Sequence, residues 1–141
     1  MININNKEFR RLNQKDIIKF IEQEEVEENF FIEFKEDDVG ASKLIEEISA
    51  FANTKGGYIF LGISDDKQIK GCKMWNEQRI TTTILDSLTP TPIYDIKKFK
   101  IEENAIYIIK VYEGNETPYI TNKGNIYERV ESSSCKITKS D

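Results

Sequence analysis

Apolar residues recur at every third or fourth position in three stretches of the chain, which predicts three helices. In the first stretch Ile17 and Ile21 share a face, and Asn13 precedes them as a helix cap. Ser42 takes the same place before the second stretch, and the third stops before Pro90, because proline cannot continue a helix. The predicted helices span residues 14–24, 42–53 and 75–88.

Strict alternation of apolar and polar residues, or short runs of β-branched and aromatic residues, predicts strands elsewhere. In the first strand Phe30, Ile32 and Phe34 fall on one face, so Glu33 and Lys35 point together to the other. The predicted strands span residues 30–35, 58–63, 69–72, 93–101, 105–112, 119–121 and 125–130, and Ser132 to Ser134 open a short tail.

Gly56 and Gly57 follow the second predicted helix directly. A phosphate-binding loop places its glycines before a helix, where backbone N–H groups face the anion. Here the order is reversed, so we interpret the glycines as a helix C-cap in the left-handed conformation that leads into the next strand.

With 141 residues, the chain has the usual length of one domain, and we expect a single domain over residues 1–141 with a core at about 14–135. The sequence contains no apolar run of membrane-spanning length and no apolar signal segment at its amino end, so we expect a soluble, cytoplasmic protein. It has no histidine and two isolated cysteines, which argues against a zinc site and against imidazole-based catalysis. Proton transfers in an enzyme of this composition would use carboxylates, lysine, tyrosine or metal-bound water.

The net charge of −5 is unevenly distributed along the chain. Residues 16–47 contain 12 acidic and 3 basic residues, a net of −9, whereas the remainder has 17 basic and 13 acidic residues, a net of +4. A basic face built by the later half of the chain is one interpretation, and an ordinary solvated surface of mixed charge is the other. The residues that would contribute to a basic face are Lys97, Lys98, Lys100, Lys110, Lys123, Arg129, Lys136 and Lys139.

Four carboxylates on or near the predicted first and second strands are candidates for a metal site. Carboxylates that converge on one cavity need a divalent cation to offset their repulsion, and such clusters hold Mg²⁺ or Mn²⁺ in nucleases. The candidate ligands are Glu28, Glu33, Asp65 and Asp66, and Lys35 would add a positive charge beside Glu33. The alternative is that these acids lie on solvated surface.

Three motifs resemble the Schlafen-type AlbA domain, a family associated with DNA binding. They lie at residues 28–35 (Glu-Asn-Phe-Phe-Ile-Glu-Phe-Lys), 50–57 (Ala-Phe-Ala-Asn-Thr-Lys-Gly-Gly) and 62–66 (Gly-Ile-Ser-Asp-Asp). Residues 126–133 resemble the closing Tyr-x-Arg-x-Gly-Ser motif, except that Glu131 stands near the position of the glycine. The resemblance covers about residues 28 to 135.

This resemblance implies an α+β fold, with a mixed or antiparallel sheet and two or three packed helices. It also implies association with nucleic acid, often as the amino-terminal module of a bacterial transcriptional regulator or helicase-related protein. Schlafen nucleases cleave structured RNA such as transfer RNA with two glutamates five residues apart and a later aspartate. Glu28 and Glu33 have that spacing, and the aspartate would be Asp65 or Asp66.

The leading hypothesis is therefore a DNA- or RNA-binding domain, acting as a homodimer or beside another module and needing no cofactor. Its predicted nucleic-acid contacts are Lys97, Lys98, Lys100, Lys123, Tyr127 and Arg129. Tyr127 would stack on unpaired bases, whereas Arg129 would bind phosphate or, alternatively, form a structural ion pair. The rivals are a Mg²⁺- or Mn²⁺-dependent endoribonuclease using Glu28, Glu33, Asp66 and Lys35, and a protein-interaction or oligomerisation module.

Overall fold

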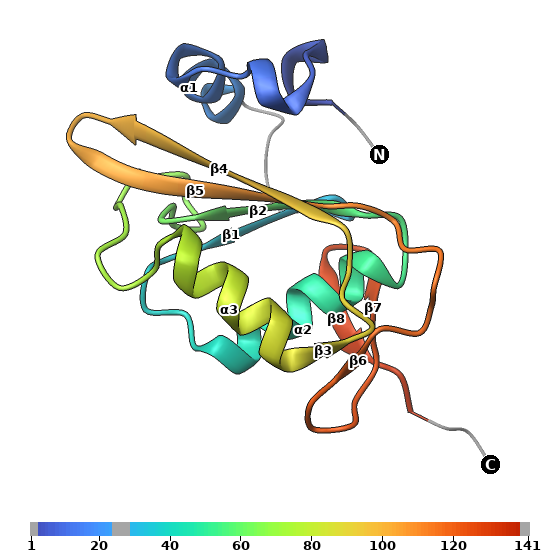
Figure 1. The fold of residues 1–141 in the computed structure, drawn as a ribbon. Coiled ribbons are helices and arrows are strands. Elements are labelled where there is room, and N and C mark those ends of the chain that lie inside the picture. The colour runs from blue at the N-terminus through green and yellow to red at the C-terminus, as the bar shows by residue number, and fades with distance from the viewer. Residues whose placement is uncertain (1–2, 24–28, 139–141) are drawn as a thin grey trace.

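A four-stranded sheet with helices on both faces forms the centre of the protein (Figure 1). The computed structural model describes residues 3–23 and 29–138. Two short 3₁₀ helices and one α-helix come first: η1 (Ile4–Asn6), η2 (Phe9–Arg11) and α1 (Gln14–Glu22). The later elements are β1 (Ile32–Lys35), α2 (Ala41–Ala52), β2 (Gly57–Leu61), α3 (Glu77–Ser87), β3 (Leu88–Thr89), β4 (Tyr94–Ile101), β5 (Asn104–Val111), β6 (Ile120–Thr121), β7 (Tyr127–Val130) and β8 (Ser133–Lys136).

The strand order in the central sheet is β1-β2-β5-β4. β1 and β2 are parallel and α2 connects them, because a parallel pair needs a crossover long enough to hold a helix. β5 is antiparallel to both of its neighbours, and β4 forms an edge of the sheet. The mixed sheet and three α-helices confirm the predicted α+β fold.

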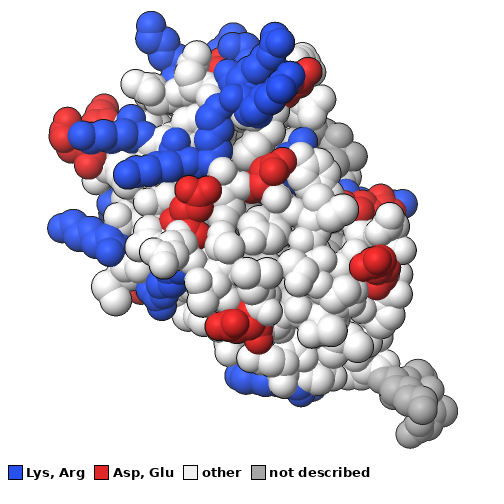
Figure 2. Space-filling view, in the orientation of Figure 1, with Lys and Arg blue, Asp and Glu red and all other residues white. Residues whose placement is uncertain are grey.

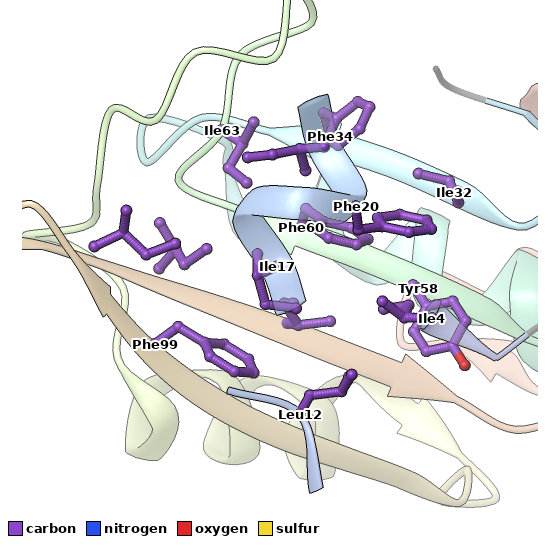
Figure 3. Close-up of a cluster of buried hydrophobic side chains, with 14 of the residues drawn as sticks. Ile4, Leu12, Ile17, Phe20, Ile32, Phe34, Tyr58, Phe60, Ile63 and Phe99 are labelled. Carbon is purple, nitrogen blue, oxygen red and sulfur yellow. The ribbon is translucent and has the colours of Figure 1, made fainter. Parts of the chain in front are cut away.

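Both faces of the sheet are buried, because apolar residues occupy both sides of β2 and β5. Figure 3 shows the first core, in which Ile17 and Phe20 of α1 lie against Phe60 and Phe99 of the sheet. The second core packs α2 and α3 against the opposite face, around Trp75. The η1, η2 and α1 segment therefore lies on one side of the sheet, and α2, α3 and the small sheets lie on the other (Figure 1).

Two of the predicted helix caps are present in the structure, and one is not. Asn13 forms a capping box with Asp16, and Gly56 has a positive φ of 77° and donates its N–H to Phe51, which closes α2. The prediction of Ser42 as the cap of α2 is wrong, because Gly40 is the N-cap and Ser42 lies in the first turn. No helix within the described part of the chain is long and apolar enough to cross a bilayer.

Two small sheets complete the fold, and the sequence pattern predicted one strand of each, β6 and β7, but not their partners β3 and β8. β3 pairs with β6, and β7 pairs with β8. The prediction that Ser132 to Ser134 open an irregular tail is wrong, because Ser133 begins strand β8 and pairs with Val130. The predicted strand at residues 69–72 is reduced to one isolated bridge between Ile63 and Ile69.

Candidate functional site

A cluster of buried charges lies where β1, α2 and β7 meet, and it consists of Glu33, Glu47 and Arg129. These residues are only 5%, 1% and 3% exposed. One guanidinium nitrogen of Arg129, Nη1, lies 2.8 Å from Glu33 and 3.4 Å from Glu47. Nη2 donates to the backbone carbonyl of Asn29 at 2.6 Å, and the guanidinium stacks over the Phe51 ring at 4.5 Å. Arg129 thus ties the β7–β8 hairpin to the sheet and to α2.

The cluster balances buried carboxylates against cations at its border. Lys35 Nζ lies 3.5 Å from Glu33, and Lys43 Nζ lies 3.3 Å from Glu47. Burial and the neighbouring Glu33 carboxyl raise the pKa of Glu47, and the charges of Lys35 and Lys43 oppose this rise only in part. The predicted proximity of Lys35 and Glu33 is therefore confirmed. The two side chains form an ion pair within the buried charge cluster.

This geometry corrects the prediction for Arg129. Its side chain is buried and its donors are engaged by two carboxylates, Ser134 and backbone carbonyls, so it does not reach a phosphate at the surface. The structural ion pair, which the sequence left as an alternative, is what the structure contains.

The predicted metal ligands are not brought together within residues 3–23 and 29–138. Glu33, Asp65 and Asp66 form no group able to hold a metal ion. Glu33 faces α2 within the charge cluster, whereas Asp66 accepts a hydrogen bond from the Ser64 hydroxyl in the turn after β2. Because Glu28 lies outside the described residues, the predicted site made by Glu28, Glu33 and one of the two aspartates stays a prediction.

Apart from Arg129, the predicted nucleic-acid contacts lie in three separate places. Lys97 shares a sheet face with Phe99 and α1, whereas Lys98 and Lys100 alternate to the other face. Lys123 and Tyr127 lie apart from these residues, in a hollow of about 130 Å³ at the start of α2. There the Lys123 ammonium donates to the Ser42 hydroxyl at 3.0 Å.

The N-terminal segment supplies cations that the sequence did not single out. The ammonium of Lys97 donates to the backbone carbonyls of Arg10 at 2.7 Å and of Leu12, which fixes η2 beside β4. The side chains of Arg10 and Arg11 are 78% and 71% exposed, and Glu8 lies 2.9 and 3.7 Å from them.

We call the surface made by Arg10, Arg11 and Lys97 the basic edge, because these residues lie on the N-terminal side of the sheet, whereas Lys98 and Lys100 point to the other face. Figure 2 shows lysine and arginine side chains gathered in the upper part of the view, where Figure 1 shows the N-terminal helices and β4. The Arg-Arg pair was visible in the sequence, but Arg10 is 87 residues from Lys97, and only the fold places them together.

The sequence model of the family described as Schlafen, AlbA_2 matches residues 28–138. Two solved structures share the fold. The N-terminal domain of a Nitrosomonas europaea protein, named as related to the ATP-dependent DNA helicase RecG, has a TM-score of 0.64 and 20% identity, over 92% of this chain and 95% of that one. The Corynebacterium diphtheriae protein DIP2311 has a TM-score of 0.61 and 22% identity, over 75% of this chain and only 22% of that one. The chain belongs to the Schlafen AlbA_2 family.

Proposed function

We propose that this protein is a nucleic-acid-binding domain and that the basic edge contacts the phosphate backbone. The observation that carries the proposal is that η2 presents two exposed arginines, Arg10 and Arg11, and that the ammonium of Lys97 on β4 holds η2 against the sheet. Membership of the Schlafen AlbA_2 family and the helicase-related name of one structural neighbour support it.

A local concentration of cations matters because the whole chain carries a net charge of −5. A phosphate backbone would be repelled by most of this surface, so binding requires a region where positive charge dominates. Arg10 and Arg11 present planar guanidinium groups suited to paired hydrogen bonds with phosphate. Glu8 lies between them and would be displaced as their partner when phosphate binds. Binding by this route needs no metal ion.

A double substitution, Arg10→Gln with Arg11→Gln, tests the proposal. Titration of a fluorescent oligonucleotide at several salt concentrations measures how steeply the affinity falls with salt. Each lost phosphate contact lowers that logarithmic slope by about 1, so the double variant should bind more weakly with a slope smaller by roughly 2.

Lys123→Gln is the matched control, because Lys123 is an exposed cation in the separate hollow beside α2. We expect it to bind as the parent does. Unchanged binding by the arginine variant, or a loss confined to Lys123→Gln, would contradict the assignment of phosphate contacts to the basic edge.

A further inference from the structure

A second hollow, of about 290 Å³, adjoins the basic edge. It lies between the N-terminal 3₁₀ helices and the end of the sheet where β4 begins and β5 ends. Its walls come from three parts of the chain, and Arg10 belongs to both the hollow and the basic edge. The lining side chains used below are Asn3, Phe9, Arg10, Asp95, Lys110 and Tyr112. Glu8 also lines the hollow, where it pairs with Arg10 and would be displaced by an entering phosphate.

The ammonium of Lys110 is held in this hollow by aromatic rings. It lies 4.8 Å from the ring centre of Tyr112, 5.9 Å from that of Tyr58 and 6.0 Å from that of Phe9. Among residues 3–23 and 29–138, no carboxylate oxygen lies within 4 Å of it. Its N–H donors are therefore available to an acceptor that enters the hollow.

The ring of Tyr112 has a fixed orientation. Its hydroxyl donates to Asp95 Oδ2 at 2.6 Å, and its backbone N–H donates to Ile93 at 3.0 Å. Tyr112 is half-buried, so part of the ring faces the hollow. Asp95 and Asn3 also line the hollow; a carboxylate accepts hydrogen bonds, and a side-chain amide both donates and accepts them.

An aromatic ring, a cation and polar groups beside a phosphate-binding surface match the needs of one nucleotide. The ring stacks on a base, the polar groups meet its edge, and Lys110 and Arg10 meet its phosphate. A base in a duplex is already stacked and paired, and it enters a lateral hollow only after being flipped out.

We propose that this hollow receives an unpaired base, so that the domain prefers single-stranded over double-stranded nucleic acid. The inference rests on the proposed function, because it assigns the form of nucleic acid that the basic edge binds. Tyr112 is the stacking residue, in place of Tyr127, which lies in the separate hollow beside α2.

The first experiment compares a labelled 12-nucleotide single strand with the same strand in a duplex, using the intact chain. The parent should bind the single strand more tightly. Tyr112→Leu should weaken single-strand binding about tenfold and leave duplex binding nearly unchanged, because stacking on one aromatic residue contributes about that much. Tyr127→Leu, the matched control, should bind as the parent does. Equal affinity of the parent for both forms, or a loss in Tyr127→Leu alone, would overturn the proposal.

A second measurement needs no variant and so does not depend on how Tyr112→Leu folds. An oligonucleotide carrying 5-iodouracil is crosslinked by light to the parent protein, and the modified peptide is identified by mass spectrometry. An adduct on Tyr112 is expected, and an adduct at Tyr127 or none at the hollow would overturn the proposal.

The two proposals fail in distinguishable ways. If the parent binds no oligonucleotide, both are wrong. If the Arg10 and Arg11 variant loses affinity while Tyr112→Leu does not, the basic edge binds nucleic acid and the hollow takes no base.

Discussion

The guanidinium of Arg129 makes five hydrogen bonds to protein groups. Because the side chain is buried, water cannot reach it to take the place of these partners. From the sequence alone, an arginine on a short, half-polar strand fits two roles: a buried ion-pair partner, or a phosphate ligand if its side chain points to solvent. The direction is decided by what lies beneath the strand, and here Glu33 and Glu47 form an acidic interior that needs a cation.

Replacing Arg129 with methionine should therefore destabilise the fold strongly. Arg129→Met leaves Glu33 buried without its closest counter-charge and removes the tie between β7 and β1, so we expect the free energy of unfolding to fall by about 3–5 kcal/mol. Urea unfolding followed by circular dichroism measures the change. Lys100→Met is the control, because its ion pair with Glu103 is exposed and should contribute less than about 1 kcal/mol. Equal effects of the two substitutions would contradict the structural role of Arg129.

At the residue scale, alternation along β1 correctly paired Glu33 with Lys35 and placed them opposite Phe34. It could not say which face was buried, because helices cover both faces of the sheet. An acid at such a position is as deeply buried as its apolar neighbours. The sequence pattern therefore predicted that Glu33 and Lys35 lie side by side, but it did not predict that Glu33 is buried.

At the scale of elements, spacing predicted all three helices and the four strands of the central sheet, because each has a strong apolar face. β8 has the sequence Ser-Ser-Cys-Lys, which has no such face, and it forms because β7 pairs with it. β3 was missed for the same reason, since it has two residues and depends on pairing with β6 far along the chain, whereas β6 itself falls within the predicted strand at residues 119–121. Elements that tertiary contacts create leave no periodic signal in the sequence.

The position of η2 depends on one lysine of an edge strand. The Lys97 ammonium satisfies the carbonyls of Arg10 and Leu12 at the end of this 3₁₀ helix, so Lys97→Met should leave them without a protein donor. We expect faster amide hydrogen exchange at residues 9–12, measured by mass spectrometry, with the core of β2 and β5 unchanged.

The control for this experiment is Lys98→Met, which alters the next residue of β4, an exposed lysine on the other face. It should leave exchange in η2 as it is. If Lys97→Met also left it unchanged, the burial of Phe9 and Leu12 would be enough to hold η2, and the lysine would have no positioning role.

At the scale of the whole molecule, the fold separates the exposed cations of the basic edge from the buried charge cluster of Glu33, Glu47 and Arg129. The basic edge occupies the N-terminal side of the sheet, and the buried charge cluster lies on the α2 side. Substitutions in one should therefore not alter the other directly. The two have different signatures in solution, since the exposed cations respond to salt and the buried carboxyls respond to pH.

The stability of the whole protein should depend on pH through Glu47. Burial raises the pKa of Glu47 above its ordinary value of 4.5, so between these two values the native state binds a proton that the unfolded state has lost. This contribution is complete below pH 4.5 and is lost as the pH rises through the raised native pKa. The loss is at most about 1.4 kcal/mol per pH unit.

Glu47→Gln removes this titration and keeps the size and shape of the side chain. The variant should match the parent below pH 4.5 and become the more stable protein as the pH rises to 7, as urea unfolding at a series of pH values would show. Glu103→Gln, at an exposed carboxyl, should differ from the parent by a small amount that is nearly constant over the same range. If Glu47→Gln instead lost stability relative to the parent as the pH rises, the raised pKa of Glu47 in the native state would be contradicted, and its ion pairs with Arg129 and Lys43 would outweigh the effect of burial.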